Sequence, residues 1–134
     1  MDNRFLARLV VAFTFFYHGL IPKILFLSPV EVEMIQAHGL GIDAVTVAVT
    51  GGVLEIFLAL LILIFRQHLW PIWVAMIMLL LLLVDVAIFT PHLLVGAFNP
   101  VTTNAAMIGL CMVVLGKANR EKQNRGSKES RESR

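Results

Sequence analysis

The chain has 134 residues, of which 58% are hydrophobic and 15% are Asp, Glu, Lys or Arg, and its formal net charge is +2. Its apolar runs are too long and too continuous for the core of a soluble domain of this size, which excludes a soluble globular protein. The composition therefore predicts an integral membrane protein, with the lipid bilayer as a partner and no nucleic-acid partner.

Four apolar stretches have about the length that a helix needs to cross the hydrocarbon layer, roughly 20 residues. They cover about residues 5–27, 45–65, 69–89 and 99–116. The first reaches this length if its helix bends at Pro22 instead of stopping there, and the last if Asn99 and Pro100 form its first turn. Transmembrane strands would need alternating polar and apolar residues, and residues 76–84 do not alternate. We predict an all-α, integral membrane four-helix bundle.

A short helix is predicted in the loop after the first span, at about residues 29–38. Ser28, Pro29 and Glu31 match a capping box with proline at the first helical position, and Gly39 supplies a stop. The helix has an apolar face, so one interpretation is a lid that lies flat at the outer interface. The other is a solvated connector, and the sequence favours neither.

The distribution of lysine and arginine predicts the orientation. With four spans both termini lie on one side of the membrane, together with most of the basic residues, whereas Lys23 falls on the other side. By the positive-inside rule both termini are cytoplasmic. Residues 117–134 carry seven basic and three acidic residues and cannot build a core. We therefore predict that they form a disordered, basic cytoplasmic tail.

Two carboxylates lie within the apolar stretches. A charge in the bilayer costs roughly 3 kcal/mol on insertion scales, so Glu55 and Asp85 should face the bundle interior. At 1.5 Å per residue, Glu55 lies about 15 Å from the outer end of its helix and Asp85 roughly 6 Å below the outer interface. Small residues at 48, 51, 52 and 59 share the face of Glu55, which places it on a packed side.

The other polar residues of the spans gather near the outer end. They predict an outward-facing polar pocket with Glu55 beneath it, lined by His18, Lys23, Asp85, Asn99 and Asn104. Lys23 has two possible partners, Asp85 and Glu55, and the estimated depths favour Asp85. That would leave Glu55 without a partner near the midplane, where it either stays protonated or serves a proton or ligand pathway. The alternative to a functional role for Lys23 is a purely structural ion pair.

Several kinds of chemistry are not indicated. Cys111 is the sole cysteine, so the chain has neither an internal disulfide nor a Cys-x-x-Cys relay. No zinc-type cluster, phosphate loop or nucleophile elbow occurs, and we predict no metal site. The sequence assigns no catalytic residue and leaves open whether the protein is an enzyme.

The chain resembles the DoxX-like membrane proteins over about residues 5–115. The resemblance rests on Tyr17-His18-Gly19-Leu20-Ile21-Pro22-Lys23, Ser28-Pro29-Val30-Glu31, Gly51-Gly52-x-x-Glu55, Asp85, and Phe98-Asn99-Pro100-x-x-x-Asn104. It implies a four-helix protein of the bacterial inner membrane. Some members of the wider group are associated with quinone-linked oxidation of sulfur compounds, but the cysteine pairs of some redox members are missing here.

Three functions are compatible with these observations. The first is a subunit that binds a quinone or a similar amphipathic ligand, alone or beside an oxidoreductase partner, in which His18 and Lys23 contact the headgroup, Asp85 orients one of them and Glu55 exchanges protons. The second is a proton-coupled small-molecule transporter that acts as a homo-oligomer. The third is a non-catalytic scaffold whose polar residues only fix helix packing.

Overall fold

The computed structural model describes the backbone of residues 3–97 and 99–132, and their side chains as far as Gly116. Phe98, part of the family-like motif, lies outside the described residues, as do residues 133–134 of the predicted tail. Within the described ranges every regular element is helical, which confirms the all-α class. The elements are α1 (Asn3–Leu20), the π-helix η1 (Ile21–Leu25), α2 (Pro29–Ala37), α3 (Ala44–Ile64), α4 (Trp70–Phe89), the 3-10 helix η2 (Pro91–Val95) and α5 (Pro100–Glu132).

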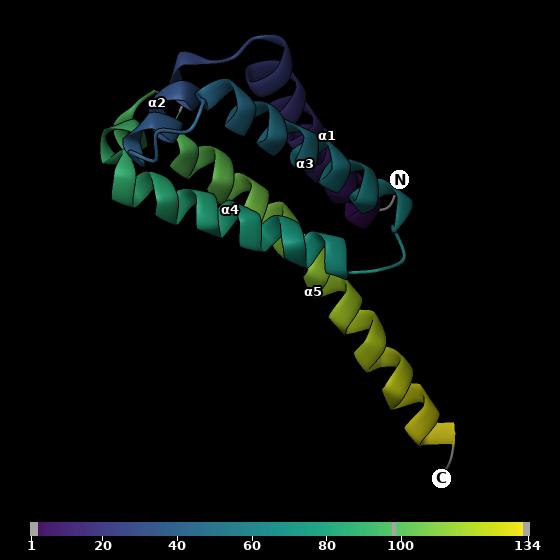
Figure 1. Cartoon of the computed structure of the whole chain (residues 1–134). Helices are drawn as coiled ribbons and strands as arrows, with labels where there is room; N and C mark the ends of the chain where they lie inside the picture. The colour runs from purple at the N-terminus through teal and green to yellow at the C-terminus, as the bar shows by residue number, and fades with distance from the viewer. Residues whose placement is uncertain (1–2, 98, 133–134) are drawn as a thin grey trace.

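The four long helices pack as two pairs, with the short helices at one end. Helix α1 lies along α3 and also contacts α5, and α5 lies along α4 (Figure 1). Helix α2 contacts α3 and α4 at the end of the bundle away from the N-terminus. Below we call this the α2 end.

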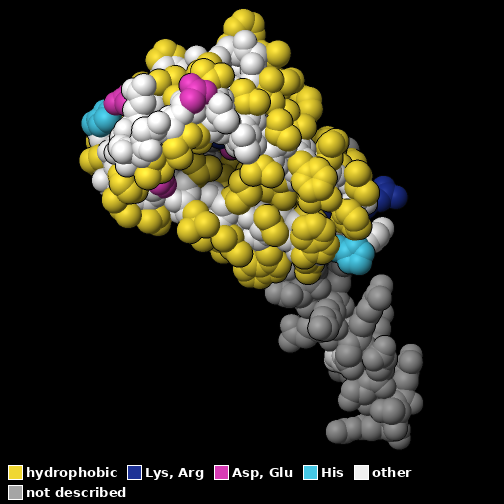
Figure 2. Space-filling model, in the orientation of Figure 1, with side chains coloured by type: hydrophobic (Ala, Val, Ile, Leu, Met, Phe, Trp, Pro, Cys, Tyr) yellow, Lys and Arg dark blue, Asp and Glu magenta, His cyan; other side chains and the backbone are white. Residues whose placement is uncertain are grey.

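Three of the four predicted spans are long and apolar enough to cross a membrane: Asn3–Leu25, Ala44–Ile64 and Trp70–Phe89. The fourth apolar helix, Pro100–Gly116, is shorter, so the fourth span stays a prediction. Hydrophobic side chains cover most of the visible face of the bundle, while acidic side chains gather near the α2 end (Figure 2). An apolar outer surface is what lipid contact requires, because bilayer hydrocarbon solvates no polar groups.

Helix α5 differs from the prediction beyond Gly116. The structure continues it as helix to Glu132, through the segment predicted to be disordered. Lysine, arginine, glutamate and glutamine are good helix formers, and no proline interrupts this stretch. The prediction of disorder rested on the segment's inability to build a core and left this helix propensity out.

The tightly packed core lies in the half of the bundle away from α2. Each long helix contributes a fully buried residue, namely Val11, Ile62, Ile72 and Val114. Arg8 is also buried there, and its guanidinium donates hydrogen bonds to the carbonyls of Ile62 and His68 near the end of α3. In the sequence, Arg8 served only as one of the basic residues that predict the orientation, and its role in capping α3 was missed.

The chain continues as helix through Pro22 after α1, in line with the predicted bend at this residue. Proline cannot donate the hydrogen bond of a regular α-helical turn, so the helix widens here into the π-helix η1. The amide of Phe26 then donates to the Ile21 carbonyl at 2.9 Å, and the amide of Ser28 to the Pro22 carbonyl at 2.8 Å. The wide turn carries Lys23 and leads directly into α2.

Two glycines set the distance between α1 and α3. A Cβ atom on Gly19 would lie 2.5 Å from the carbonyl oxygen of Gly52, and a Cβ on Gly52 would lie 2.5 Å from the carbonyl oxygen of Gly19. Both neighbours are backbone atoms and cannot move aside as a side chain can. The two helices therefore touch backbone to backbone at these positions.

We expect Gly52→Ala to lower the free energy of unfolding by about 1–3 kcal/mol, because the added methyl group overpacks the contact with α1. The matched control is Gly51→Ala. A Cβ on Gly51 meets no atom within 4 Å, and alanine favours the helix, so this change should be neutral or stabilising by up to about 1 kcal/mol. Thermal unfolding in mild detergent measures both. Equal losses in the two variants would contradict the backbone contact.

Candidate functional site

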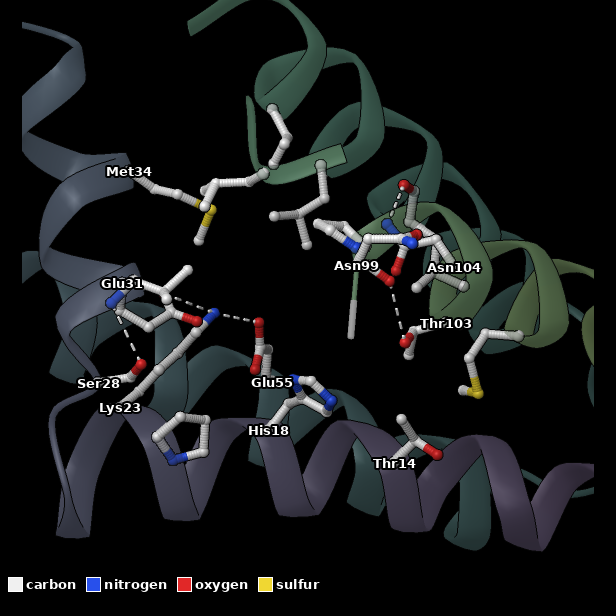
Figure 3. A pocket seen from close by; sticks show the side chains of 18 of the residues that line it. Thr14, His18, Lys23, Ser28, Glu31, Met34, Glu55, Asn99, Thr103 and Asn104 are labelled. Atoms are coloured by element: carbon white, nitrogen blue, oxygen red, sulfur yellow. Dashed lines mark hydrogen bonds and ion pairs between the residues drawn. The ribbon is translucent and has the colours of Figure 1, made fainter. Parts of the chain in front are cut away.

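A cavity of about 370 Å³ lies at the α2 end, between α1, α3, α4 and α5 and beneath α2 (Figure 3). Its polar lining combines two groups of side chains. On the side of α1, α2 and α3 these are Thr14, His18, Lys23, Ser28, Glu31 and Glu55. On the side of η2 and α5 they are His92, Asn99, Thr103 and Asn104.

Lys23 is the centre of the first group. Its Nζ lies 2.5 Å from Oε1 of Glu55 and 3.8 Å from Oε2 of Glu31. The three side chains are only 11%, 6% and 15% exposed, so these charges are buried together. The depth argument that paired Lys23 with Asp85 and left Glu55 without a partner is therefore corrected.

The pairing follows from the direction of the helices. In any α-helix the Cα–Cβ bonds tilt toward the N-terminus. Because α1 and α3 run antiparallel, Lys23 tilts into the bundle and Glu55 tilts toward the α2 end. A Cβ on Gly52 would lie 3.0 Å from the Lys23 Cβ, and a Cβ on Gly19 would lie 3.1 Å from the Glu55 Cβ. The two side chains thus start beside the helix contact and reach toward each other.

Glu55 has one oxygen left over. Its Oε2 is buried and, among the described residues, has no hydrogen-bond partner. An unsatisfied carboxylate oxygen in a low-dielectric site is costly, so native structures normally give it a proton or a donor. Figure 3 shows the carboxylate pointing into the cavity beside His18.

Glu31 was not among the predicted site residues. In the structure Ser28 caps α2 by accepting from the Val30 amide at 3.3 Å, but the Glu31 carboxylate turns to Lys23 instead of completing a capping box. Burial raises the pKa of Glu31, an effect that the Lys23 ammonium opposes and the nearby Glu55 reinforces. The cluster of one ammonium and two carboxylates therefore has room for an extra proton.

The asparagines on the opposite wall form structural hydrogen bonds. Asn99 caps α5, because its Oδ1 accepts from the Thr102 amide at 2.9 Å and its Nδ2 donates to the Gly96 carbonyl. Asn104 donates through Nδ2 to the Leu79 carbonyl at 3.3 Å, which ties α5 to α4. Both residues also line the cavity.

Asp85 does not line this cavity. Its Oδ1 lies 2.9 Å from Nε2 of His38, the residue that caps the C-terminal end of α2. The other ring nitrogen of His38 lies 2.9 Å from the Met34 carbonyl, and the ring packs on Phe89 with centroids 4.1 Å apart. A carbonyl only accepts, so Nδ1 must carry a proton, and a further proton is shared between Nε2 and Asp85.

A second histidine–carboxylate pair also holds α2. Nε2 of His92 in η2 lies 2.7 Å from Oε1 of Glu33. The two pairs join α2 to α4 and to η2, and α2 covers the cavity. These contacts favour the lid over the solvated connector.

Of the predicted residues, the structure brings His18, Lys23, Glu55, Asn99 and Asn104 to one cavity and separates Asp85 from them. Sequence reasoning missed Glu31, His38 and His92. The Ser28 cap gave a usable signal for Glu31, because it fixes the start of α2. His38 and His92 had no such signal, since their partners depend on how the lid docks. No group of three His, Cys, Asp or Glu that would hold a metal ion occurs in the described part of the chain.

Residues 12–112 match the family model described as DoxX-like family. The chain belongs to the DoxX-like family. No curated protein and no solved structure matches it. The matched range contains His18, Lys23, Glu31, Glu55 and Asp85, and with the three long apolar helices it identifies a small membrane protein.

We expect Lys23→Met to lower the free energy of unfolding by about 3–5 kcal/mol, because it leaves buried carboxylates without their cation. Adding Glu55→Gln should recover part of this loss. The control is Lys23→Met with Asp85→Asn, which should recover nothing, since Asp85 contacts His38. A double-mutant cycle by thermal unfolding measures both pairs. Strictly additive losses for Lys23 and Glu55 would contradict the ion pair.

The lid contact should depend on pH. The hydrogen bond to Asp85, with a second to the Met34 carbonyl, raises the pKa of His38 above its ordinary value of 6.5. A raised histidine pKa stabilises the folded state below the ordinary value, and that contribution disappears as pH rises through the raised value. The Tm difference between the wild type and His38→Gln should therefore be largest near pH 6 and shrink toward about pH 9. A difference that stays constant, or that persists in an Asp85→Asn background, would contradict this assignment.

Proposed function

We propose that this membrane protein binds a quinone or quinol, or a closely similar amphipathic molecule, in the cavity at the α2 end. The observation that carries the proposal is the unpartnered Oε2 of Glu55, a buried acceptor that faces an otherwise largely apolar space. A hydroxyl group of a quinol is a donor of the required kind. Volumes of about 300–1,000 Å³ are usual for small-molecule sites, and this cavity falls within that range.

The lining suits an aromatic ring with polar edges. Phe15, Leu79, Leu82, Val86 and Met107 supply apolar surface from α1, α4 and α5. The polar groups lie on two sides of this surface, with Lys23, Glu55 and His18 together on one side and Asn99, Thr103 and Asn104 on the other (Figure 3). A few placed polar groups in an apolar pocket are typical of sites that fix the orientation of a small molecule.

Each polar group has a distinct role in this proposal. Oxidation of a quinol to a quinone releases two electrons and two protons, and the Glu55 carboxylate accepts the two hydroxyl protons one after the other. The Lys23 ammonium has three donors, of which one binds Glu55 at 2.5 Å while Glu31 lies at ion-pair distance, 3.8 Å, so a donor remains for a carbonyl of the oxidised ligand. Glu31 takes up the proton that Glu55 releases, because both carboxylates share Lys23. The electrons themselves pass to or from an oxidoreductase partner.

The predicted orientation supports this arrangement. The basic residues Arg4, Arg8 and Arg66 lie at the end opposite α2, which favours cytoplasmic termini in an inner membrane and a cavity that opens outward. Protons from an oxidised quinol would then leave on the outer side. The Glu55–Lys23 pair suits the homo-oligomeric transporter equally well, and no contact in the described part of the chain favours that alternative specifically.

The test is ligand binding by the purified protein in mild detergent. We expect co-purified quinone in lipid extracts, and a rise in Tm on adding a ubiquinol. Glu55→Gln should weaken quinol binding about tenfold or more, because a hydrogen bond to a charged acceptor is lost. Asp43→Asn, an acid-to-amide change at the exposed cap of α3, is the matched control and should leave binding unchanged. No retained quinone and no Tm shift would reject the proposal, and a loss of stability without loss of binding would favour the scaffold.

A further inference from the structure

We infer that the ligand carries a long apolar tail, and that this tail leaves the cavity through a groove between α3 and α4 beneath residues 39–42. The inference rests on the proposed function and makes the ligand class more specific. It concerns a second cavity, of about 680 Å³, which the proposed function does not use.

The second cavity borders the first. The two share Lys23, Glu31, Met34 and Leu82 in their linings. Lys23 and Glu31 form the polar side of the boundary, while Met34 of α2 and Leu82 of α4 form its apolar side. In the inferred arrangement, the head is held at Glu55 and the tail passes Met34 and Leu82 into the second cavity.

The groove is open along α3. Its wall there consists of Val47, Ala48 and Gly51, and a Cβ on Gly51 would meet no atom within 4 Å. Although a short turn joins them, α3 and α4 pack mainly against other helices. The visible surface is hollowed in this part of the molecule, with hydrophobic side chains around the opening (Figure 2).

The chemistry of the groove fits a hydrocarbon chain. Ile35, Leu40, Ile42, Val47 and Leu82 line it, and Leu40 and Ile42 are 70% and 56% exposed at its rim. The polar residues His38 and Asp85 bind each other, and Lys23 and Glu31 lie at the boundary with the first cavity. Between Val47 and Gly51 the α3 wall rises about 6 Å, the length of a chain of roughly five methylenes.

Tail and head observations point to the same molecule. The buried, unpartnered Oε2 of Glu55 favours a ligand with a polar head, and the apolar groove favours a ligand with an apolar tail. A tail that enters the groove from lipid leaves a phase as apolar as the groove, so its contribution to binding comes from close packing against the groove walls. The preferred ligand is then drawn from the lipid phase, not from the aqueous side.

The experiment compares decylubiquinone with the same ring lacking its tail. Gly51→Leu places a side chain in the groove at a position where the backbone has room for it. We expect this change to weaken binding of decylubiquinone about tenfold, while binding of the tail-less ring stays within about twofold. Gly51→Ala should give a much smaller effect, and Leu54→Phe, on the exposed face of α3, none. Because each ligand is compared with itself, its partition into detergent cancels.

A second variant keeps the test valid if Gly51→Leu does not fold. Val47→Phe narrows the same groove from the next turn of α3 and should act in the same way. If both ligands bind the wild type and the groove variants weaken both equally or neither, the tail assignment is wrong while the proposed function stands. If neither ligand binds the wild type, the proposed function fails, and this inference fails with it.

Discussion

The backbone contact between α1 and α3 at Gly19 and Gly52 is the constraint on which the polar site depends. Antiparallel helices that approach this closely bring the first carbons of Lys23 and Glu55 next to the opposite glycine. Since the side chains of the two helices tilt toward opposite ends of the bundle, a lysine near the α2 end and a glutamate farther into the bundle meet at 2.5 Å. Any side chain at either glycine would separate the helices and with them the charges.

The molecule divides packing and polarity between its two ends. Away from α2 the four long helices close around fully buried aliphatic residues, and Arg8 satisfies the carbonyls where α3 ends. Toward α2 the same helices leave cavities that are lined by charged and amide side chains and covered by a short helix. The closely packed half holds the helices in register, while the lid has no buried residue of its own and is fastened by the two histidine–carboxylate pairs and by the Glu31–Lys23 ion pair.

Much of the fold could be read from the sequence, because it depends on local patterns. The length of the apolar stretches predicted the long helices, Pro22 predicted the bend after α1, and the small residues beside Glu55 predicted that its face is buried. The ion pairs could not be read in this way. Assigning Lys23 to Glu55 needs the distance between two helices and the reach of a flexible side chain, and residue depth alone favoured Asp85. Likewise, the pairing of Asp85 with His38 depends on where the lid docks, which no periodicity encodes. The helical extension of α5 was missed because charge content and helix propensity give opposing indications there.

Lys23 carries one positive charge and lies between carboxylates from two elements, Glu55 of α3 and Glu31 of α2. These carboxylates compete for the same ammonium, so a proton or a ligand donor that satisfies Glu55 leaves Lys23 freer to hold Glu31. Occupancy of the deep site and closure of the lid are then linked equilibria, and the linkage is reciprocal: whatever fastens α2 must change the affinity at Glu55 by the same factor. A single lysine thereby connects the buried carboxylate of α3 to the helix that covers the cavity.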